Sequence, residues 1–528
     1  MKQLRFLALM LVQGMASSAS DNILLIIADD YGIDASALYN TSPGAAMAPT
    51  PNIAALAANG VRFTAAYAYP TCSPTRAAML TGRYGFRTGT GDVVSAAAGN
   101  SLTAAEFTLP EAFAANASLG YQLKHFGKWH LTAGMGQSVN MSPCTVGGWP
   151  AFAGAISGAL SSYTSWTKVV TNGTPGGTSA TATTTYATTD VVNDAVPWIQ
   201  AQSAAHKPWF AWVAFNAPHT PFHLPSPTSL CPSYASLSGT AGEISANPRS
   251  YYNAAVEAMD TEIGRLLAAV DLSKTTVIFL GDNGTPGQVL QTPFPTGHGK
   301  DTLYEGGIRV PLVIRSPAVV SPGRASDAPA HVVDIYSTVL DLAGIAASGT
   351  VPSAVTLDSK SLLPVLQNQT VTRPRRYSEQ FDSNLATTGG RILRDDRYKI
   401  IRNRSGTDEF YDLQSDPYES ANLLAGGVGA MTAERQSRYY RLRFDLGSYA
   451  AMAKPPVITS GLAAGSFSVT SAQDAGAAQT LWRCTDLPGG FWVPAPGATN
   501  SVSGTNITFT DPAPPASAAY YSILAETP

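Results

Sequence analysis

The sequence predicts an α/β protein with a mixed, mostly parallel central sheet flanked by helices. Continuous apolar runs of strand length occupy 22–28, 209–215 and 276–280, and such runs are typical of parallel strands buried on both faces. Segments with helix-start and helix-stop signals alternate with these runs, which favours the same fold class. Acidic, amide or histidine side chains follow each run, at the strand ends where open α/β sheets bind ligands.

Composition bounds the size and the class of the protein. The 528 residues are 45% hydrophobic and 13% charged, and the net charge is -3. A chain of this length can hold a large core and more than one domain. The sequence has no Lys/Arg-rich run and no basic excess, which argues against nucleic acid as a partner.

The first twenty residues have the pattern of a secretory leader. Lys2 and Arg5 precede a short apolar run at 6–12, and small residues at 16–20 offer a cleavage site. The apolar run is too short to span a bilayer, and no later segment is long and apolar enough to do so. We therefore expect a periplasmic or secreted protein without an integral membrane segment in the mature chain.

The first strand, at 22–28, is followed at once by Asp29 and Asp30. In isolation this aspartate pair also fits a turn or a helix cap. A helix is expected next, because Thr50-Pro51 suits a cap and first turn and Gly60 suits a helix end.

The following segment, Cys72-Ser73-Pro74-Thr75-Arg76, predicts a helix start that can bind an anion. Ser73 can cap the helix, Pro74 suits its first position and Gly82 can end it. Free N–H groups at a helix start favour anions, and Arg76 adds a forked positive charge one turn in. Taken alone, the segment fits about as well a buried free cysteine beside a structural arginine.

The region 146–185 is rich in Gly, Ala, Ser and Thr, and Asn172-Gly173 is a hairpin signal within it. Its aromatic residues predict ordered loops and a hairpin over the site rather than disorder. These side chains would either line a substrate cleft or pack at the surface; they are Trp149, Phe152, Tyr163 and Trp166.

Two further strands carry candidate ligands at their ends. The run 209–215 precedes Asn216-Ala217-Pro218-His219, and the run 276–280 precedes Gly281-Asp282-Asn283-Gly284. The remaining α/β elements are expected to be a helix near 254–267, a strand at 310–314 and a helix at 333–343 that ends at Gly344.

The pattern changes from about residue 391. Short antiparallel strands are expected at 398–401 and 409–413, and alternating runs after 455 predict a small β-sandwich. The predicted organisation is a leader at 1–20, a main α/β domain at 21–390, an antiparallel α+β subdomain at 391–455 and a β-sandwich at 456–528.

Four cysteines leave room for one disulfide in an oxidising compartment. We expect Cys144 to pair with Cys231, because both lie in loop-like stretches of one region. Cys484 lies in another predicted domain, and the spacings do not match a zinc site.

Several separated motifs occur in one order between about residues 21 and 455. Beside 22–30 and the C-x-P-x-R segment that begins at Cys72, they are Gly127-Lys128-Trp129-His130-Leu131, Ala217-Pro218-His219-Thr220-Pro221, Gly281-Asp282-Asn283-Gly284, Gly299-Lys300, the stretch 305–311 (EGGIRVP) and the stretch 410–423. Together they resemble the type I sulfatases of the alkaline phosphatase superfamily.

The resemblance implies a divalent cation and a modified cysteine. Oxygen ligands suit a hard cation, and the family usually holds calcium, with magnesium as the alternative. The cysteine of the family is oxidised to formylglycine (3-oxoalanine), so a formylglycine-generating maturation enzyme is an expected partner. By analogy, the metal ligands are Asp29, Asp30, Cys72, Asp282 and Asn283.

The resemblance also implies hydrolysis of sulfate monoesters. The hydrated aldehyde at position 72 would attack sulfur and form a covalent sulfoenzyme. Arg76, Lys128 and Lys300 would bind the sulfate and, with the cation, stabilise the charge that develops in the transition state.

Two histidines would transfer protons in this scheme. His219 would hold the sulfate with Lys300 and protonate the leaving alkoxide, and His130 would deprotonate the remaining hydroxyl to restore the aldehyde. His298 is a candidate substrate contact. The other matched or polar residues are assigned structural or surface roles, namely His125, His206 and His331 (structural), His223 (surface), and Glu305 and Arg309 (scaffold).

The implied substrate is a sulfated small molecule or a sulfated carbohydrate. A phosphonate or phosphate ester hydrolase of the same superfamily is the nearest alternative, because a tetrahedral-anion site does not by itself select sulfur. A non-catalytic sulfated-glycan binding protein is a second alternative. The complete set of matched positions argues against it.

Overall fold

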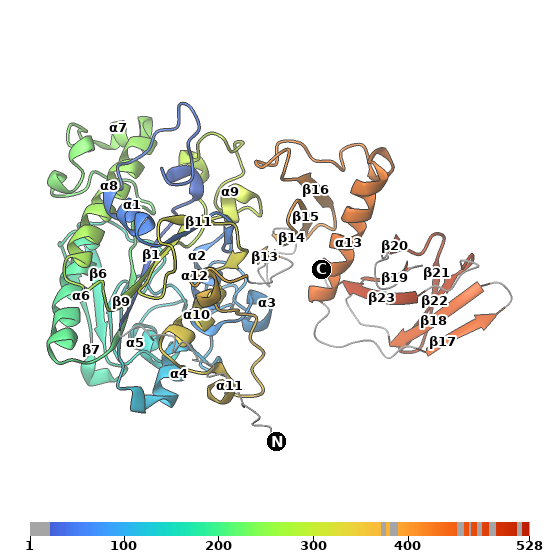
Figure 1. The fold of residues 1–528 in the computed structure, drawn as a ribbon, viewed down its shortest axis with the longest axis horizontal. Coiled ribbons are helices and arrows are strands. Elements are labelled where there is room, and N and C mark those ends of the chain that lie inside the picture. The colour runs from blue at the N-terminus through green and yellow to red at the C-terminus, as the bar shows by residue number, and fades with distance from the viewer. Residues whose placement is uncertain are drawn as a thin grey trace, which may run out of the picture.

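The computed structural model describes residues 22–370, 376–380, 389–450, 459–463, 466–472, 478–484, 493–514 and 520–526. A large sheet with helices on both faces forms the N-terminal body, and three smaller antiparallel sheets follow it along the long axis of the molecule (Figure 1). The leader predicted for residues 1–20 lies outside the described residues.

The large sheet has ten strands in the order β11-β2-β10-β9-β1-β8-β4-β5-β6-β7. Its centre is parallel, with β1 (Asn22–Ala28) between β9 (Thr275–Gly281) and β8 (Trp209–Ala214), and with β4 (Gln122–Gly127) beside β8. Every residue of β1, β8 and β9 is buried, as expected for apolar parallel strands covered on both faces.

Antiparallel pairs occur toward both edges of this sheet, at β10 with β9 and β2, and at β6 with β5 and β7. The β6–β7 pair is the hairpin that Asn172-Gly173 predicts. The outer strands are β2 (Val61–Phe63), β5 (Phe152–Gly154), β6 (Trp166–Thr171), β7 (Thr178–Thr183), β10 (Leu312–Arg315) and β11 (Arg324–Ser326).

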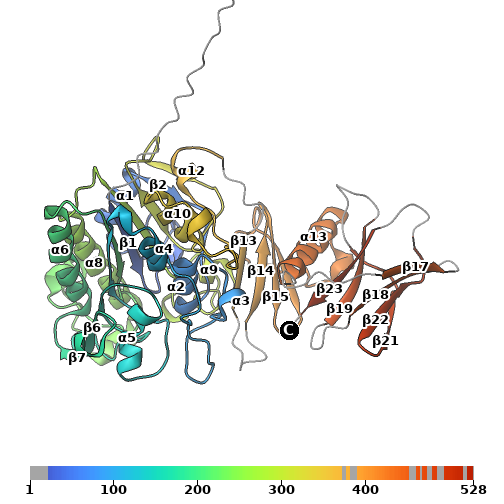
Figure 2. The same cartoon turned by 90° about the horizontal axis from the view of Figure 1, so that it is seen from below.

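Side chains of β1 alternate between two cores, one on each face of the sheet. Leu24 and Ile26 belong to one core, and Ile23, Leu25 and Ile27 belong to the other. The first core is covered by α1 (Pro51–Ala58), α6 (Ala187–Ala204) and α8 (Pro248–Leu267), and the second by α2 (Cys72–Thr81), α4 (Leu109–Ala115) and α10 (Asp334–Leu342) (Figure 2).

The other short elements of this body connect these layers. They are α3 (Gly85–Thr88), α5 (Gln137–Thr145), α7 (Ala241–Ala246), α9 (Glu305–Ile308), α11 (Ala347–Thr350), α12 (Leu363–Leu366) and the paired strands β3 (Ala66–Tyr67) and β12 (Ala330–His331).

A four-stranded antiparallel sheet, β13-β14-β15-β16, follows the main body. Helix α13 (Ala433–Ala450) packs against β14 and β15. The predicted boundary at residue 391 stays a prediction, although β13 enters this sheet from before it. The strands are β13 (Arg376–Gln380), β14 (Gly390–Arg394), β15 (Tyr398–Asn403) and β16 (Asp408–Asp412).

Two antiparallel sheets, β17-β18-β22-β21 and β20-β19-β23, form the C-terminal part. Buried Val469, Leu481, Phe509 and Ile523 make one apolar cluster from strands of both sheets, which is the packing of a sandwich. The strands are β17 (Thr459–Ala463), β18 (Ser466–Ala472), β19 (Ala478–Cys484), β20 (Val493–Pro494), β21 (Thr499–Ser503), β22 (Asn506–Asp511) and β23 (Tyr520–Glu526).

The predicted fold class is confirmed, and one central strand was not predicted. Strand β4 carries Gln122, Lys124 and His125 among its six residues, so it lacks the apolar run that marks its neighbours. Among the described residues, no helix is both long and apolar enough to cross a membrane.

The expected disulfide between Cys144 and Cys231 is wrong, because both residues are free thiols. Cys231 is buried in the core that α6 and α8 cover. Cys144 is half-buried, and its Sγ lies 3.7 Å from the Thr171 carbonyl oxygen of β6.

Candidate active site

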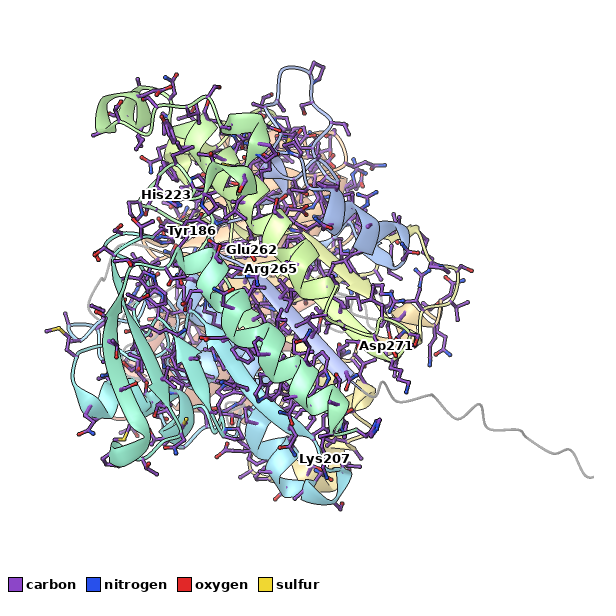
Figure 3. The ribbon with its side chains drawn as sticks, turned by 90° about the vertical axis from the view of Figure 1, so that its left-hand side faces the viewer. Tyr186, Lys207, His223, Glu262, Arg265 and Asp271 are labelled. Atoms are coloured by element: carbon purple, nitrogen blue, oxygen red, sulfur yellow. The ribbon has the colours of Figure 1, made fainter. Side chains whose placement is uncertain are left out.

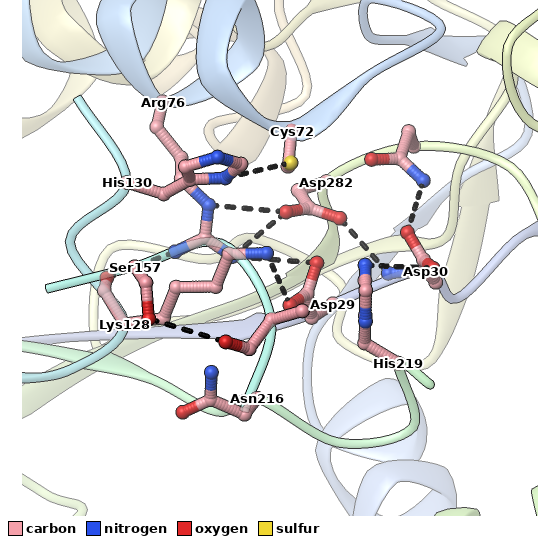
Figure 4. A network of polar contacts seen from close by, with 12 residues as sticks. Asp29, Asp30, Cys72, Arg76, Lys128, His130, Ser157, Asn216, His219 and Asp282 are labelled. Carbon is pink, nitrogen blue, oxygen red and sulfur yellow. Dashed lines mark hydrogen bonds and ion pairs between the residues drawn. The ribbon is translucent and has the colours of Figure 1, made fainter. Parts of the chain in front are cut away.

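Four neighbouring strands deliver the candidate residues to one edge of the sheet. Asp282-Asn283 follow β9, Asp29-Asp30 follow β1, Asn216 to His219 follow β8, and Lys128 to His130 follow β4. Because these strands are parallel, their carboxyl ends meet, and the start of α2 adds Cys72 and Arg76 (Figure 4). Side chains that are widely separated in sequence thus form one polar network.

Cys72 lies at the first position of α2 and is 1% exposed. The helix begins two residues earlier than the Pro74 start that the sequence predicts, and Ser73 does not cap it. The Ser73 Oγ instead accepts a hydrogen bond from the Val94 N–H at 3.1 Å. The Cys72 Sγ lies 3.0 Å from the His130 Nδ1, and burial raises the pKa of the thiol even though Lys128 opposes this.

Arg76 is buried and joins two of the strand ends. Its Nη2 and Nε donate to the Asp282 Oδ2 at 2.7 and 3.1 Å, and its Nη1 donates to the Lys128 carbonyl oxygen at 3.0 Å. Burial and the nearby charge of Asp29 raise the pKa of Asp282 to about 6 although Arg76 opposes them. The guanidinium therefore fixes the relative positions of α2, β9 and β4.

Two lysines contact the paired aspartates. The Lys128 Nζ lies 2.5 Å from the Asp29 Oδ2, and the Lys300 Nζ lies 2.7 Å from the Asp30 Oδ1. Burial alone would raise the pKa of Asp29, but Lys128, followed by His219, Arg76 and Lys300, holds it below its ordinary value. The Asp29 carboxylate is therefore charged at neutral pH in this cationic surrounding.

The oxygen-rich part of the site fits a metal ion. Ligand atoms of Asp29, Asp30 and His219 lie within 4.8 Å of one another and can hold a cation. The Asp29 Oδ1 and the Asn283 Oδ1 are buried without a hydrogen-bond partner, and such orphaned oxygens call for an ion or water. Carboxylate and amide oxygens are the donors that hard divalent cations prefer.

His130 is held from both sides. Its backbone N–H donates to the Ile156 carbonyl oxygen at 3.0 Å, and its φ of 53° is left-handed. On the other side, a Cβ on Gly158 would come within 2.2 Å of the imidazole ring. Burial, followed by the charges of Lys128 and Arg76, lowers the pKa of His130 well below its ordinary value. The imidazole next to Cys72 is therefore neutral.

His219 lies at the open side of the site and is 14% exposed. Its Nδ1 lies 2.7 Å from the Thr220 carbonyl oxygen, which can only accept, so Nδ1 carries the proton. Its Nε2 is 3.6 Å from the Asp30 Oδ2. This tautomer leaves Nε2 as the nitrogen that faces the cluster.

His298 lies apart from this network. Its ring stacks on Tyr304 at a centroid distance of 3.6 Å, and the Tyr304 hydroxyl donates to Glu409 of the neighbouring antiparallel sheet. Among the interactions of the described residues, His298 has no contact with Cys72, Lys300 or His219. Its role as a substrate contact stays a prediction.

Of the histidines assigned structural roles, His125 and His331 are buried as expected and His206 is exposed, and the surface assignment of His223 does not hold. His125 lies among Trp129, Trp149 and Trp212, and burial lowers its pKa to about 3. His223 is not an ordinary surface residue, because its ring stacks on Tyr163 at 4.0 Å.

Two residues near the site were given no role from the sequence, although Asn216 was noted at the end of its strand. Ser157 and Asn216 lie with the network in Figure 4, and the Asn216 Nδ2 is buried without a partner. Ser157 follows β5 in a Gly/Ala/Ser-rich stretch with no distinguishing pattern. Asn216 could have been given a role, since it follows a buried strand directly before the Ala-Pro-His segment.

Fold and site together define a hydrolase of anionic esters that is built on an α/β sheet. The chain belongs to the sulfatase family, whose model, described as "Sulfatase", matches residues 21–345. A second model, "N-sulphoglucosamine sulphohydrolase, C-terminal", matches residues 297–438. The protein is accordingly a sulfuric-ester hydrolase.

Individual relatives agree with the family match. N-acetylgalactosamine-6-sulfatase of Canis lupus familiaris is 30% identical over 399 residues, or 70% of each chain. Arylsulfatase A of Homo sapiens is 30% identical over 481 residues, which covers 81% of this chain and 88% of the relative. The crystal structure of Ps i-CgsB in complex with k-i-k-neocarrahexaose has a TM-score of 0.63 at 23% identity and covers 82% and 92% of the two chains, which shows the shared fold.

Proposed function

We propose that this sulfatase uses Cys72, converted to formylglycine, and a bound calcium ion to cleave sulfate monoesters of carbohydrates. The observation that carries the proposal is the 3.0 Å contact between the Cys72 Sγ and the His130 Nδ1 beside Arg76 and Lys128. This arrangement supports the proposal because the groups that would act as nucleophile, neutral base and anion-binding cations lie in one buried site.

The environment of Cys72 supports a modified side chain. Burial raises the pKa of the thiol, so an unmodified cysteine would be protonated and weakly nucleophilic at neutral pH. As formylglycine, position 72 would supply a hydrated aldehyde whose hydroxyl attacks sulfur. His130 lies at the correct distance to remove a proton from a group at this position.

Three cations would bind the sulfate. Arg76 is fixed by Asp282 and by the Lys128 carbonyl oxygen, so its charge is preorganised for the reaction. Lys128 and Lys300 now contact Asp29 and Asp30. Calcium, or magnesium as the alternative, would be held by Asp29, Asp30, Asp282 and Asn283 with position 72, and would polarise the sulfate group.

His219 would protonate the leaving oxygen. Its Nδ1 proton is committed to the Thr220 carbonyl oxygen, so the transferred proton has to be a second one on Nε2, which faces the site. His219 would thus act as an imidazolium that becomes neutral when the leaving alkoxide takes this proton. Lys300, 11% exposed at the same open side, would hold the sulfate next to it.

Sulfated carbohydrate is the proposed substrate class, and the proposed location is the periplasm or the exterior. A relative is named N-acetylgalactosamine-6-sulfatase, and Ps i-CgsB, which has the same fold, was solved in complex with k-i-k-neocarrahexaose. The leader pattern at 1–20 supports export. A maturation enzyme that generates formylglycine would then act on the chain.

The test is an assay of protein co-expressed with a formylglycine-generating enzyme. We expect turnover of p-nitrophenyl sulfate and of sulfated sugars to exceed that of the matching phosphate and phosphonate, and a mass spectrum in which CHO replaces CH2SH at position 72. Cys72→Ala should be inactive, whereas Cys144→Ala, at a thiol outside the site, should stay active. Active protein with an intact Cys72 thiol would rule out the proposed nucleophile.

The metal has its own test. Removal of calcium with a chelator should abolish turnover and lower the thermal unfolding midpoint, because an ion bound only to the native state stabilises it. Added calcium should restore both properties. Metal analysis establishes that the chelated protein contains no calcium. If this metal-free protein keeps its unfolding midpoint and its activity, the calcium site is contradicted.

A further inference from the structure

We propose that Tyr163 is a positioning residue that orients His219 for proton transfer to the leaving group. The inference rests on the proposed role of His219 and adds a function for the segment between β5 and β6. Tyr163 makes no contact with Cys72 or with the sulfate-binding cations in the described structure; it acts through the backbone that carries the histidine.

The Tyr163 hydroxyl joins both ends of the turn that carries His219. It lies 2.6 Å from the Asn216 carbonyl oxygen and 2.8 Å from the His219 carbonyl oxygen. The same Asn216 carbonyl accepts the His219 N–H at 3.0 Å. One hydroxyl proton shared between two carbonyls therefore fixes the first and last residues of one turn relative to each other.

The direction of the His219 ring depends on this backbone. Its Nδ1 donates to the carbonyl oxygen of Thr220, the next residue, so the ring is tied to its own main chain. On the other side, Nε2 is 3.6 Å from the Asp30 Oδ2, beyond hydrogen-bond distance. A shift of the turn would thus move Nε2 directly, and small displacements of a reacting group are costly in rate.

Tyr163 itself is held rigidly. It is 2% exposed, its carbonyl accepts from the Ala187 N–H at 2.8 Å, and its ring lies flat on His223 with 24° between the planes. This packing leaves the tyrosine few alternative positions, so its hydroxyl provides a fixed reference for the turn.

His223 extends the support to the far side of His219. Its Nδ1 donates to the Pro221 carbonyl oxygen at 2.9 Å, and its Nε2 accepts from the Tyr186 hydroxyl at 3.0 Å. Figure 3 shows His223 and Tyr186 together near one end of α6. Burial lowers the pKa of His223 to about 4, so this stack is uncharged at neutral pH. Residues on both sides of His219 are consequently held by one aromatic group.

The test uses Tyr163→Phe, which removes the hydroxyl and keeps the ring stacked on His223. If the hydroxyl positions a general acid, its loss should matter most for a leaving group that needs protonation. We expect kcat for a sugar sulfate to fall by about 10- to 100-fold, with KM within about twofold, and kcat for p-nitrophenyl sulfate to fall by less than about threefold.

Tyr39→Phe is the matched control. The Tyr39 hydroxyl also donates to a buried carbonyl, that of Leu312 at 2.9 Å, but it lies at β10 and has no contact with the turn. Both substrates should be cleaved within about twofold of wild type by this variant. Thermal unfolding of both variants shows whether the fold is kept.

A second background separates positioning from a general disturbance. In His219→Ala, the additional Tyr163→Phe change should cause no further loss on the sugar sulfate, because the group it orients is gone. An equal loss on both substrates, a loss that persists without His219, or no loss on either substrate would overturn the positioning role. A wild-type protein inactive on every sulfate would instead overturn the proposed function.

Discussion

Two buried charged clusters of this protein differ in what their charges are used for. The cluster around Cys72 is open to solvent on one side, where His219 and Lys300 are 14% and 11% exposed, and it contains the orphaned Asp29 and Asn283 oxygens. The second cluster, which we call the joint, consists of Glu305, Arg394, Lys399 and Glu419. It connects α9 of the main body with the four-stranded antiparallel sheet.

Three of the four side chains of the joint are almost completely buried, and the fourth, Arg394, is 14% exposed. The Lys399 Nζ lies 2.7 Å from Glu419 and 3.3 Å from Glu305, and the Glu305 Oε2 accepts from the Tyr67 hydroxyl at 2.8 Å. Lys399, Glu305 and Glu419 are at most 1% exposed.

The comparison teaches that buried ion pairs alone do not mark a site, since Arg394 of the joint is also 14% exposed and the Glu419 Oε1 also lacks a hydrogen bond besides its ion pair with Lys399. The cluster around Cys72 differs because carboxylate, amide and histidine side chains converge there at the ends of parallel strands.

The largest expected effect on stability comes from opening the joint with Lys399→Met. Two buried carboxylates would lose their shared cation, and removing one partner of a buried pair costs about 3–5 kcal/mol. Urea unfolding should show this loss, while kcat per folded molecule is retained. Glu419→Gln in the same chain should recover part of the stability. A variant that keeps wild-type stability would show that the joint is not a structural cluster.

Arg76→Lys is the corresponding change at the open cluster. Lysine keeps the charge but loses the forked contact with Asp282 and the Lys128 carbonyl oxygen. We expect kcat to fall by about 10²- to 10³-fold with a smaller stability loss than at the joint.

Arg83→Lys is the control for this change, since Arg83 follows the same helix and pairs with Glu106 away from the site. Its activity should stay within about twofold of wild type. An Arg76→Lys protein as active as the Arg83→Lys protein would remove Arg76 from the reaction.

The two clusters also differ in how far the sequence predicts them. Part of the open cluster follows from local signals, because Asp29 and Asp282 come directly after buried strands, His219 follows another strand within a few residues, and parallel strand ends meet. Lys128, His130 and Lys300 were assigned only through the resemblance to the family.

In the joint, only Glu305 was assigned a scaffold role. Lys399 lies inside a short alternating strand and Glu419 in a turn, and nothing near either residue indicates a partner that packing brings from far along the chain.

The same distinction explains the other outcomes. The β-strand pattern of 466–510 predicts a sandwich, since alternation and turns are local properties. The position of Tyr163 against the His219 turn and the placement of His298 on Tyr304 depend on tertiary packing between loops. Such contacts have no periodicity from which they could be predicted.

Glu379 of β13 provides a pH test of the contact between the four-stranded antiparallel sheet and α3 of the main body. It is buried, accepts from the Phe86 N–H and the Tyr377 hydroxyl at 2.7 Å each, and burial raises its pKa to about 7 although Tyr377 opposes this. The native state therefore binds this proton more tightly than the unfolded chain does. Its stabilising contribution is complete below about pH 4.5, the ordinary value, and is lost as the pH rises through about 7.

The free energy of unfolding should change by at most about 3.4 kcal/mol between pH 4.5 and 7 because of Glu379. Glu379→Gln should remove this dependence and be more stable than wild type above pH 7. The measurement is the free energy of unfolding of both proteins at pH 5 and pH 8. Parallel pH profiles of the two proteins would show that Glu379 does not titrate in this range.

The smallest effect is expected at a surface counterpart of the joint, with Lys168→Met. The Lys168 Nζ lies 2.7 Å from both Asp190 and Asp194, which is the same contact distance as Lys399 to Glu419. The three side chains are 10–26% exposed, so water can solvate the carboxylates that lose their partner. The loss should stay below about 1 kcal/mol in urea unfolding. If the stability loss of Lys168→Met equalled that of Lys399→Met, burial would not be the property that separates the joint from a solvent-exposed ion pair.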